Sequence, residues 1–90
     1  MRLINFNAPA ILERTIVAKL DENRYGVTHV VQVFSGTLTE CLYQFDRKPE
    51  TQKPRYSILT NDTARVGKCN LFWRDLERLA QEPNYPFRHN

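Results

Sequence analysis

Aromatic and basic side chains interleave between positions 43 and 56, and no other pattern in the chain is as typical of a function. The set consists of Tyr43, Phe45, Arg47, Lys48, Lys53, Arg55 and Tyr56. Proteins that hold single-stranded nucleic acid usually combine aromatic platforms for the bases with cations for the phosphates. The interleaving therefore predicts a modest-affinity single-stranded nucleic-acid site. The K/R-G-F/Y-G/A-F pattern of RNA-recognition motifs is absent, and aromatic residues on strands more often belong to a core.

The chain ends in a short aromatic tail, NYPFRHN. It is too short to fold alone, so we expect Tyr85 and Phe87 to lie on the body of the protein or on a partner. With the interleaved set, these two residues complete the candidate binding surface.

Residues for catalysis, metal binding or cofactor binding are sparse. A zinc site needs about four Cys or His ligands at suitable spacing, and the supply is Cys41, Cys69, His29 and His89, with no close pair. The three glycines form neither a dinucleotide nor a phosphate-binding loop. In the predicted strand register, His29 faces away from Cys41, which argues against a Cys–His dyad. His29 lies diagonal to Glu40 on the same face. The sequence predicts no enzyme, no metal and no cofactor.

Length and charge set broad limits. Ninety residues predict a single domain, 1–90, whose stability is marginal unless it packs well or dimerises. The net charge is +3, all of it in the second half, with both signs interspersed. A dedicated nucleic-acid domain usually has a larger, clustered excess. No apolar run is long enough to span a membrane, no signal peptide is evident, and the two cysteines form no disulfide framework. We therefore expect a cytoplasmic protein with reduced, largely buried thiols and no membrane association.

The most β-prone stretch is Gly26–Phe45. Residues 27–34 and 37–45 are rich in Val, Thr, Phe and Tyr, and Ser35-Gly36 between them suits a two-residue turn. The sequence predicts a central hairpin here. Alternation along it places Val31, Val33, Leu38 and Leu42 on one face, which we expect to be the core face.

The elements before this hairpin are ambiguous. Residues 2–6 alternate as a short strand would. Between positions 8 and 22, Asn7 and Pro9 suit a helix start, and apolar residues recur at spacings of three and four. This pattern favours a helix. The β-branched run Thr15–Leu20 supports the alternative, a strand joined by a turn to the next one.

The second half is predicted more simply. Residues 46–54 are polar and contain two prolines, as in a solvated loop, and Arg55–Thr60 reads as a strand. Asn70 suits a helix cap, and a period of 3.6 predicts a C-terminal helix over 70–82 that Trp73 and Leu76 anchor to the sheet. The fold class is α+β: a mainly antiparallel sheet of three or four strands with one or two helices packed on one face.

Two functions follow from these expectations. The first is a small non-enzymatic interaction or regulatory protein that binds another protein or itself as a homodimer, because strand edges and aromatic residues suit such contacts. The alternative is single-stranded nucleic-acid binding through the 43–56 region.

Overall fold

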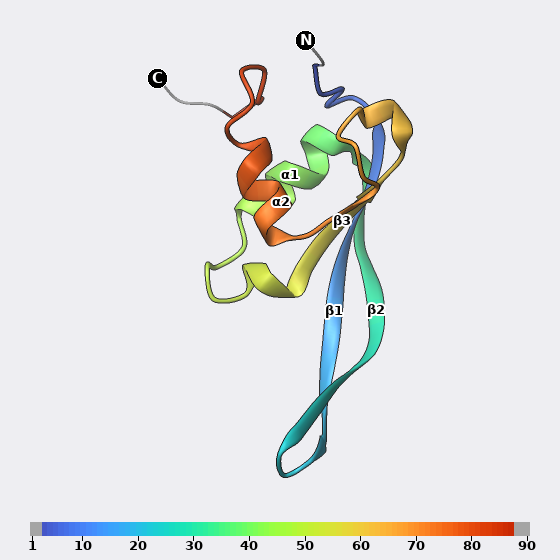
Figure 1. The fold of residues 1–90 in the computed structure, drawn as a ribbon, viewed down its shortest axis with the longest axis vertical. Coiled ribbons are helices and arrows are strands. Elements are labelled where there is room, and N and C mark those ends of the chain that lie inside the picture. The colour runs from blue at the N-terminus through green and yellow to red at the C-terminus, as the bar shows by residue number, and fades with distance from the viewer. Residues whose placement is uncertain (1–2, 88–90) are drawn as a thin grey trace.

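A computed structural model describes residues 3–87 of the chain. Four strands form one sheet: β1 (Pro9–Asp21), β2 (Arg24–Thr37), β3 (Tyr56–Thr60) and β4 (Asn70–Leu71). Two α-helices, α1 (Leu38–Asp46) and α2 (Trp73–Leu79), and two 3-10 turns, η1 (Lys53–Arg55) and η2 (Asp62–Ala64), complete the fold (Figure 1). The strand order is β2-β1-β3-β4, and all neighbouring strands are antiparallel. The predicted α+β class, with four strands and a C-terminal helix, is confirmed.

The helix favoured between residues 8 and 22 is wrong, because this segment is strand β1. Ala8, Ala10 and Leu12 are buried while their neighbours are more exposed, which is the period of two that a strand produces. The β-branched run that follows Leu12 pairs with β2 from Thr15 onward. The apolar spacing fitted a helix only because residues 8, 12, 16 and 20 satisfy both periods.

The predicted central hairpin is half right. Its first strand lies within β2, but residues 38–46 form helix α1 instead of a second strand. Thr37 begins the helix: its side chain accepts a hydrogen bond from the Glu40 N–H, and the Glu40 carboxylate accepts one from the Thr37 N–H. This reciprocal capping box satisfies two backbone donors that a helix start leaves free. The hairpin turn lies instead between β1 and β2, at Glu22-Asn23.

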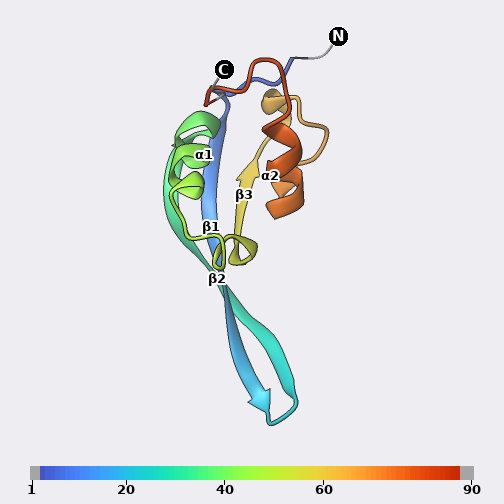
Figure 2. The same cartoon turned by 90° about the vertical axis from the view of Figure 1, so that its left-hand side faces the viewer.

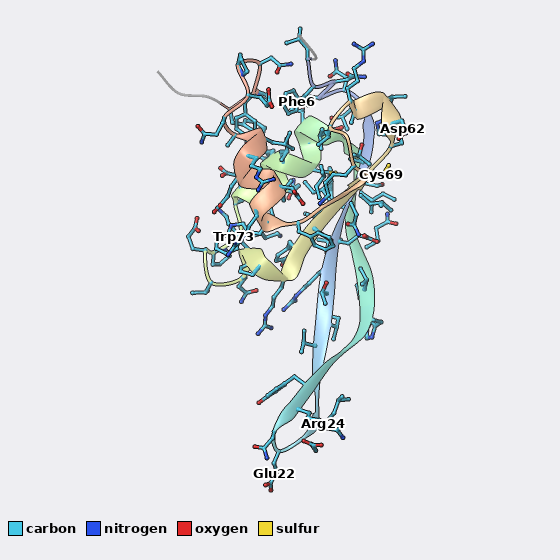
Figure 3. The ribbon with its side chains drawn as sticks, viewed as in Figure 1. Phe6, Glu22, Arg24, Asp62, Cys69 and Trp73 are labelled. Atoms are coloured by element: carbon cyan, nitrogen blue, oxygen red, sulfur yellow. The ribbon has the colours of Figure 1, made fainter. Side chains whose placement is uncertain are left out.

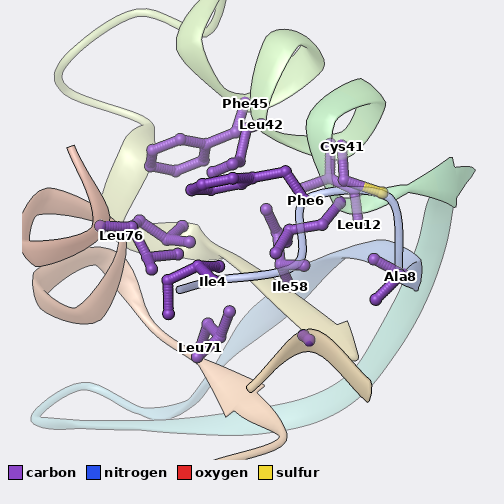
Figure 4. Close-up of a cluster of buried hydrophobic side chains, with 14 of the residues drawn as sticks. Ile4, Phe6, Ala8, Leu12, Cys41, Leu42, Phe45, Ile58, Leu71 and Leu76 are labelled. Carbon is purple, nitrogen blue, oxygen red and sulfur yellow. The ribbon is translucent and has the colours of Figure 1, made fainter. Parts of the chain in front are cut away.

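Both helices pack on the same face of the sheet, as predicted (Figure 2). Leu12 of β1 and Ile58 of β3 lie opposite each other and are fully buried beneath them. The helices contribute Leu38, Cys41, Leu42 and Phe45 from α1, and Leu76 and Leu79 from α2. Ile4 and Phe6 of the N-terminal segment fill the space between the helices and the sheet (Figure 4). Trp73 is partly buried against this core and Leu76 is fully inside it.

The β1–β2 hairpin extends far beyond this body. Pairing between β1 and β3 ends at Arg14 and Tyr56, and β1 continues to Asp21 with β2 as its sole neighbour among the described residues. We call residues 15–30 the arm (Figure 1). It gives the molecule its longest dimension of 48 Å, against 28 and 21 Å in the other directions.

Three further expectations need correction. Residues 3–6 form no strand; Met1 and Arg2 lie outside the described residues. The face assigned to the core is exposed at Val31 and Val33, because α1 covers the sheet near the body and no helix among the described residues covers the arm. The C-terminal helix is shorter than 70–82, because Asn70 and Leu71 pair with β3 as strand β4. None of the described helices is long and apolar enough to cross a membrane.

Candidate interaction surface

Large apolar side chains are exposed along one face of the arm. Thr15 of β1 pairs with Val30 of β2, and Lys19 pairs with Tyr25. Residues directly opposite each other lie on the same face of a sheet. Val30 and Tyr25 therefore share a face with the odd-numbered residues of β1, which include Val17. Tyr25 is 67% exposed, and Val17 and Val30 are close to half exposed. The helices cover the opposite face, where Leu12 and Ile58 are fully buried. Water therefore contacts these apolar side chains directly.

The same face continues onto the body through Ile11 and Leu59, which lie opposite each other on β1 and β3. We call Ile11, Val17, Tyr25, Val30 and Leu59 the open face. A shallow hollow of about 400 Å³ lies at its body end, lined largely by Pro9, Ile11, Ser35 and Leu59. Neither helix covers this face in residues 3–87 (Figures 1 and 2). A continuous apolar strip of this kind is typical of a protein-binding surface.

The two edges of the arm differ. The pairing of β1 with β2 skips Val33 and Thr28 in β2, and it skips Leu20 in β1 beside the hairpin turn. Such bulges bend an edge strand and protect it from pairing with other chains. The other edge belongs to β1, which carries no extra residue from Pro9 to Lys19. From Thr15 to Lys19, the edge of β1 is therefore regular, whereas β2 has a bulge at Thr28 in the same part of the arm.

The arm has almost no net charge. At its tip, the Asp21 carboxylate pairs with the Arg24 guanidinium at 2.6 Å. The N–H of Asn23 and the Arg24 side chain hold the pKa of Asp21 below its usual value. Glu22 and Arg24 project from the end of the arm (Figure 3). A surface without excess positive charge suits a protein partner better than a phosphate backbone.

The predicted basic-aromatic set does not form one exposed surface. Phe45 and Tyr56 are buried in the core, so neither ring is available for stacking on a base. Lys53 lies over the Phe45 ring, and its Nζ pairs with Glu50 at 2.9 Å and Asp46 at 3.9 Å. That ammonium is therefore largely neutralised.

Some of the predicted residues do meet on the outer side of α1. Arg47 lies over the Tyr43 ring, 5.5 Å from its centroid, and the Phe87 ring lies 6.0 Å from the same ring. Phe34, Tyr43 and Phe87 line a groove of about 380 Å³ there. Lys48 lies over the Tyr56 ring instead, and Arg55 is exposed at the start of β3. The set is thus divided between two parts of the surface.

The aromatic tail lies on the body, which was one of the two expected positions. The Asn84 side chain donates to the Ile4 carbonyl at 2.8 Å. The Tyr85 ring contacts Phe6 and Phe87 edge-on, and burial raises the pKa of its hydroxyl. Tyr85 therefore serves the core, and Phe87 forms the outer end of this ring cluster.

Groups that could do chemistry lie apart. His29 is exposed on the arm, Cys41 is buried in α1, and Glu40 caps α1, so the predicted relation of His29 to Glu40 is wrong. Cys69 is exposed rather than buried, and its thiol donates to Asp62. Partial desolvation, followed by the charge of Asp62 and this hydrogen bond, raises the pKa of Cys69. Within residues 3–87, no group of three or more His, Cys, Asp or Glu side chains could hold a metal ion.

Comparisons with protein-family models, curated proteins and solved structures found no significant match to this chain. Its function is therefore inferred from the geometry of the surface. The arm was not predicted from the sequence as a candidate site. Its one available signal was the β-branched run Thr15–Leu20, which was considered only as an alternative to a helix.

Proposed function

We propose that this chain is a small non-enzymatic interaction protein that binds another protein through the open face of its arm. The observation that carries the proposal is the exposure of Val17, Tyr25 and Val30 on a hairpin without a core of its own. A two-stranded hairpin is marginally stable in water, so a partner that covers this face would stabilise the arm as it binds. The neutral charge of the arm favours a protein surface as that partner.

The test compares variants on the arm with a matched variant on α1. Tagged wild-type protein, Tyr25→Ser and Val30→Ser on the arm, and Tyr43→Ser on α1 are used to capture proteins from cells of the source organism. Captured proteins are identified by mass spectrometry, and each is then purified and titrated against the four baits.

We expect a protein partner that binds wild type and Tyr43→Ser alike and loses at least about tenfold in affinity with each arm variant, as buried aromatic anchors do. A partner that binds all four proteins equally would contradict the proposal, and so would capture of nucleic acid alone.

A second candidate function is binding of single-stranded nucleic acid. In its favour, Arg47, Lys48 and Arg55 have no carboxylate partner within residues 3–87, so they are free to contact phosphates. Three such contacts would give a log–log salt slope of about −2. Replacing the three residues with Ser should flatten that slope, measured by fluorescence anisotropy with a labelled oligonucleotide. If no oligonucleotide binds more tightly than about 100 μM at physiological salt, this candidate is excluded.

A further inference from the structure

We propose that the edge of β1 in the arm pairs with the same edge of a second copy of this chain. The product is a continuous antiparallel ribbon in the order β2-β1-β1-β2. The inference rests on the arm being the contact element proposed above. It uses the edge of the arm, whereas the proposed partner protein uses the open face.

The direction of the backbone groups of β1 follows from a hydrogen bond at its start. The Thr60 hydroxyl of β3 donates to the Pro9 carbonyl at 2.8 Å, so Pro9 directs its carbonyl toward β3. Alternate residues of a strand direct their N–H and C=O groups to the same side. No extra residue interrupts β1 as far as Lys19. Thr15 and Val17 therefore direct their N–H and C=O groups to the side where β3 has ended.

The composition of this edge suits strand addition. The segment TIVAKL, residues 15–20, contains three β-branched residues, one charge and neither Gly nor Pro. Segments of this kind readily pair with another strand when they lie on an edge. The opposite edge of the arm carries the β2 bulge at Thr28, which hinders such pairing.

A second copy fits the length of this edge. It runs from Thr15, the first residue past β3, to Asp21, the last residue of β1. Antiparallel pairing about a two-fold axis at Ala18 sets Thr15 opposite Asp21 of the partner subunit, and Val17 opposite Lys19 of the partner subunit. Val17 and Lys19 belong to the set that directs its backbone groups outward, whereas the extra residue Leu20 interrupts the alternation before Asp21. The regular part of the open edge between Val17 and Lys19 is therefore paired in both copies. An axis nearer the body would place the partner strand where β3 already lies.

The charges at the two ends of the edge are complementary. In this arrangement, the tip of each arm reaches the base of the other. Arg14 and Arg55 lie at the base, where η1 leads into β3, and neither forms an ion pair within residues 3–87. The Nε of Arg14 is buried without a hydrogen-bond partner. Glu22 is exposed at the tip without an ion pair in the described residues. The two-fold axis places Glu22 of one copy near Arg14 and Arg55 of the other copy, once at each end of the interface.

The expected dimer is reversible. Pairing makes a four-stranded ribbon from two marginal hairpins, and sheets of three or more strands are considerably more stable. A contact between two narrow ribbons falls at the small end of the range of protein interfaces. Dimerisation should therefore depend on concentration.

A charge-swap experiment tests the arrangement in purified full-length protein. Sedimentation velocity is run at low salt from low to high micromolar concentration on wild type, Glu22→Arg, Arg55→Glu and an equimolar mixture of the two variants. Each single variant places like charges together at both ends of the interface, so we expect at least about a tenfold increase in Kd. In the mixed dimer, each end again joins a cation to a carboxylate, so the mixture should regain wild-type association.

Two α2 variants, Glu77→Arg and Arg74→Glu, make the same changes of charge away from the arm. Alone or mixed, they should associate like wild type. A separate variant, Val17→Pro, removes an outward N–H without removing a bond to β2. It should weaken association while its melting temperature stays close to that of wild type at low concentration.

A wild type that remains monomeric at high micromolar concentration would overturn the inference. So would single charge variants that dimerise as well as wild type, or a mixture that fails to regain association. This test is independent of the open face. If the protein is monomeric but Tyr25→Ser still weakens binding of the partner protein, the dimer alone is refuted. If the protein is a dimer but Tyr25→Ser leaves binding of the partner protein unchanged, the proposed function alone is refuted.

Discussion

The two halves of β1 show how different the body and the arm are. In the body, the Leu12 side chain is fully buried beneath the helices, whereas Leu20 near the arm tip is 60% exposed. The local backbone is extended at both positions. The difference arises because α1 and α2 cover one face of the sheet in the body, and no described element covers either face of the arm (Figures 1 and 2). A strand is thus built to the same pattern whether its side chains meet a core or water.

The arm has one small contact that substitutes for a core. The Leu20 side chain lies over Gly26 so closely that a Cβ at position 26 would come within 2.8 Å of its Cδ1. Gly26 therefore lets Leu20 fold back onto the ribbon. This contact reduces the exposure of one leucine but leaves the open face uncovered.

The same substitution on both halves of β1 should have very different effects on stability. Leu12→Ala removes fully buried atoms and should lower the free energy of unfolding by about 2–5 kcal/mol. Leu20→Ala should change it by no more than about 0.5 kcal/mol, as exposed substitutions usually do. Urea unfolding at low protein concentration measures both. Equal losses for the two variants would show that the arm is as well packed as the body.

The core of the body also predicts a loss of stability at alkaline pH. Burial, with the nearby Glu40 carboxylate, raises the pKa of the Cys41 thiol from 9.0 to about 11. As the pH rises, the unfolded chain loses this proton first, so it binds fewer protons than the folded chain between about pH 9 and 11. The free energy of unfolding should fall across that window, by at most about 2–3 kcal/mol.

Cys41→Ala isolates this effect from that of the other groups that ionise at high pH. The variant should lose the part of the slope that Cys41 contributes, while Cys69→Ala should retain it because Cys69 is exposed. Unfolding is followed by fluorescence at several pH values. Parallel curves for wild type and Cys41→Ala would contradict burial of this thiol.

A smaller effect is expected where the arm strand β2 passes into α1. Thr37→Ala removes the side-chain cap of α1 and should cost about 1 kcal/mol of stability. Thr51→Ala, at an exposed loop position, is the matched control and should be nearly neutral. Thermal unfolding followed by circular dichroism compares the two. A neutral Thr37→Ala would show that α1 is held by packing alone.

Some elements were predictable because their local pattern has one interpretation. Strand β3 lies in the predicted range 55–60, and α2 lies within 70–82. Helix α1 was also within reach of sequence reasoning, since Thr37 and Glu40 form the T-x-x-E pattern of a capping box. The β-propensity of the surrounding residues led to the strand prediction instead. Local propensity is a weak guide when tertiary contacts decide the outcome.

The candidate surface was harder to predict for a physical reason. Alternation along β1 and β2 identifies strands, but it does not reveal which stretch a helix will cover. Likewise, Phe45 and Tyr56 resemble a stacking platform in sequence, and only the packing of α1 on β3 shows that both are buried. Exposure depends on contacts between distant segments, and the single sequence did not reveal those contacts.

We expect the arm to gain its order from a partner rather than from its own packing. Amide hydrogen exchange, measured residue by residue at low and high protein concentration, tests it most directly. We expect the amides of Leu12 and Ile58 to exchange slowly at both concentrations. At low concentration, the arm amides should exchange much faster than those of Leu12 and Ile58. At high concentration, the outward amides of Thr15 and Val17 should exchange more slowly because the second copy protects them. Arm amides as protected as those of Leu12 in the dilute monomer would show that the arm is ordered without a partner.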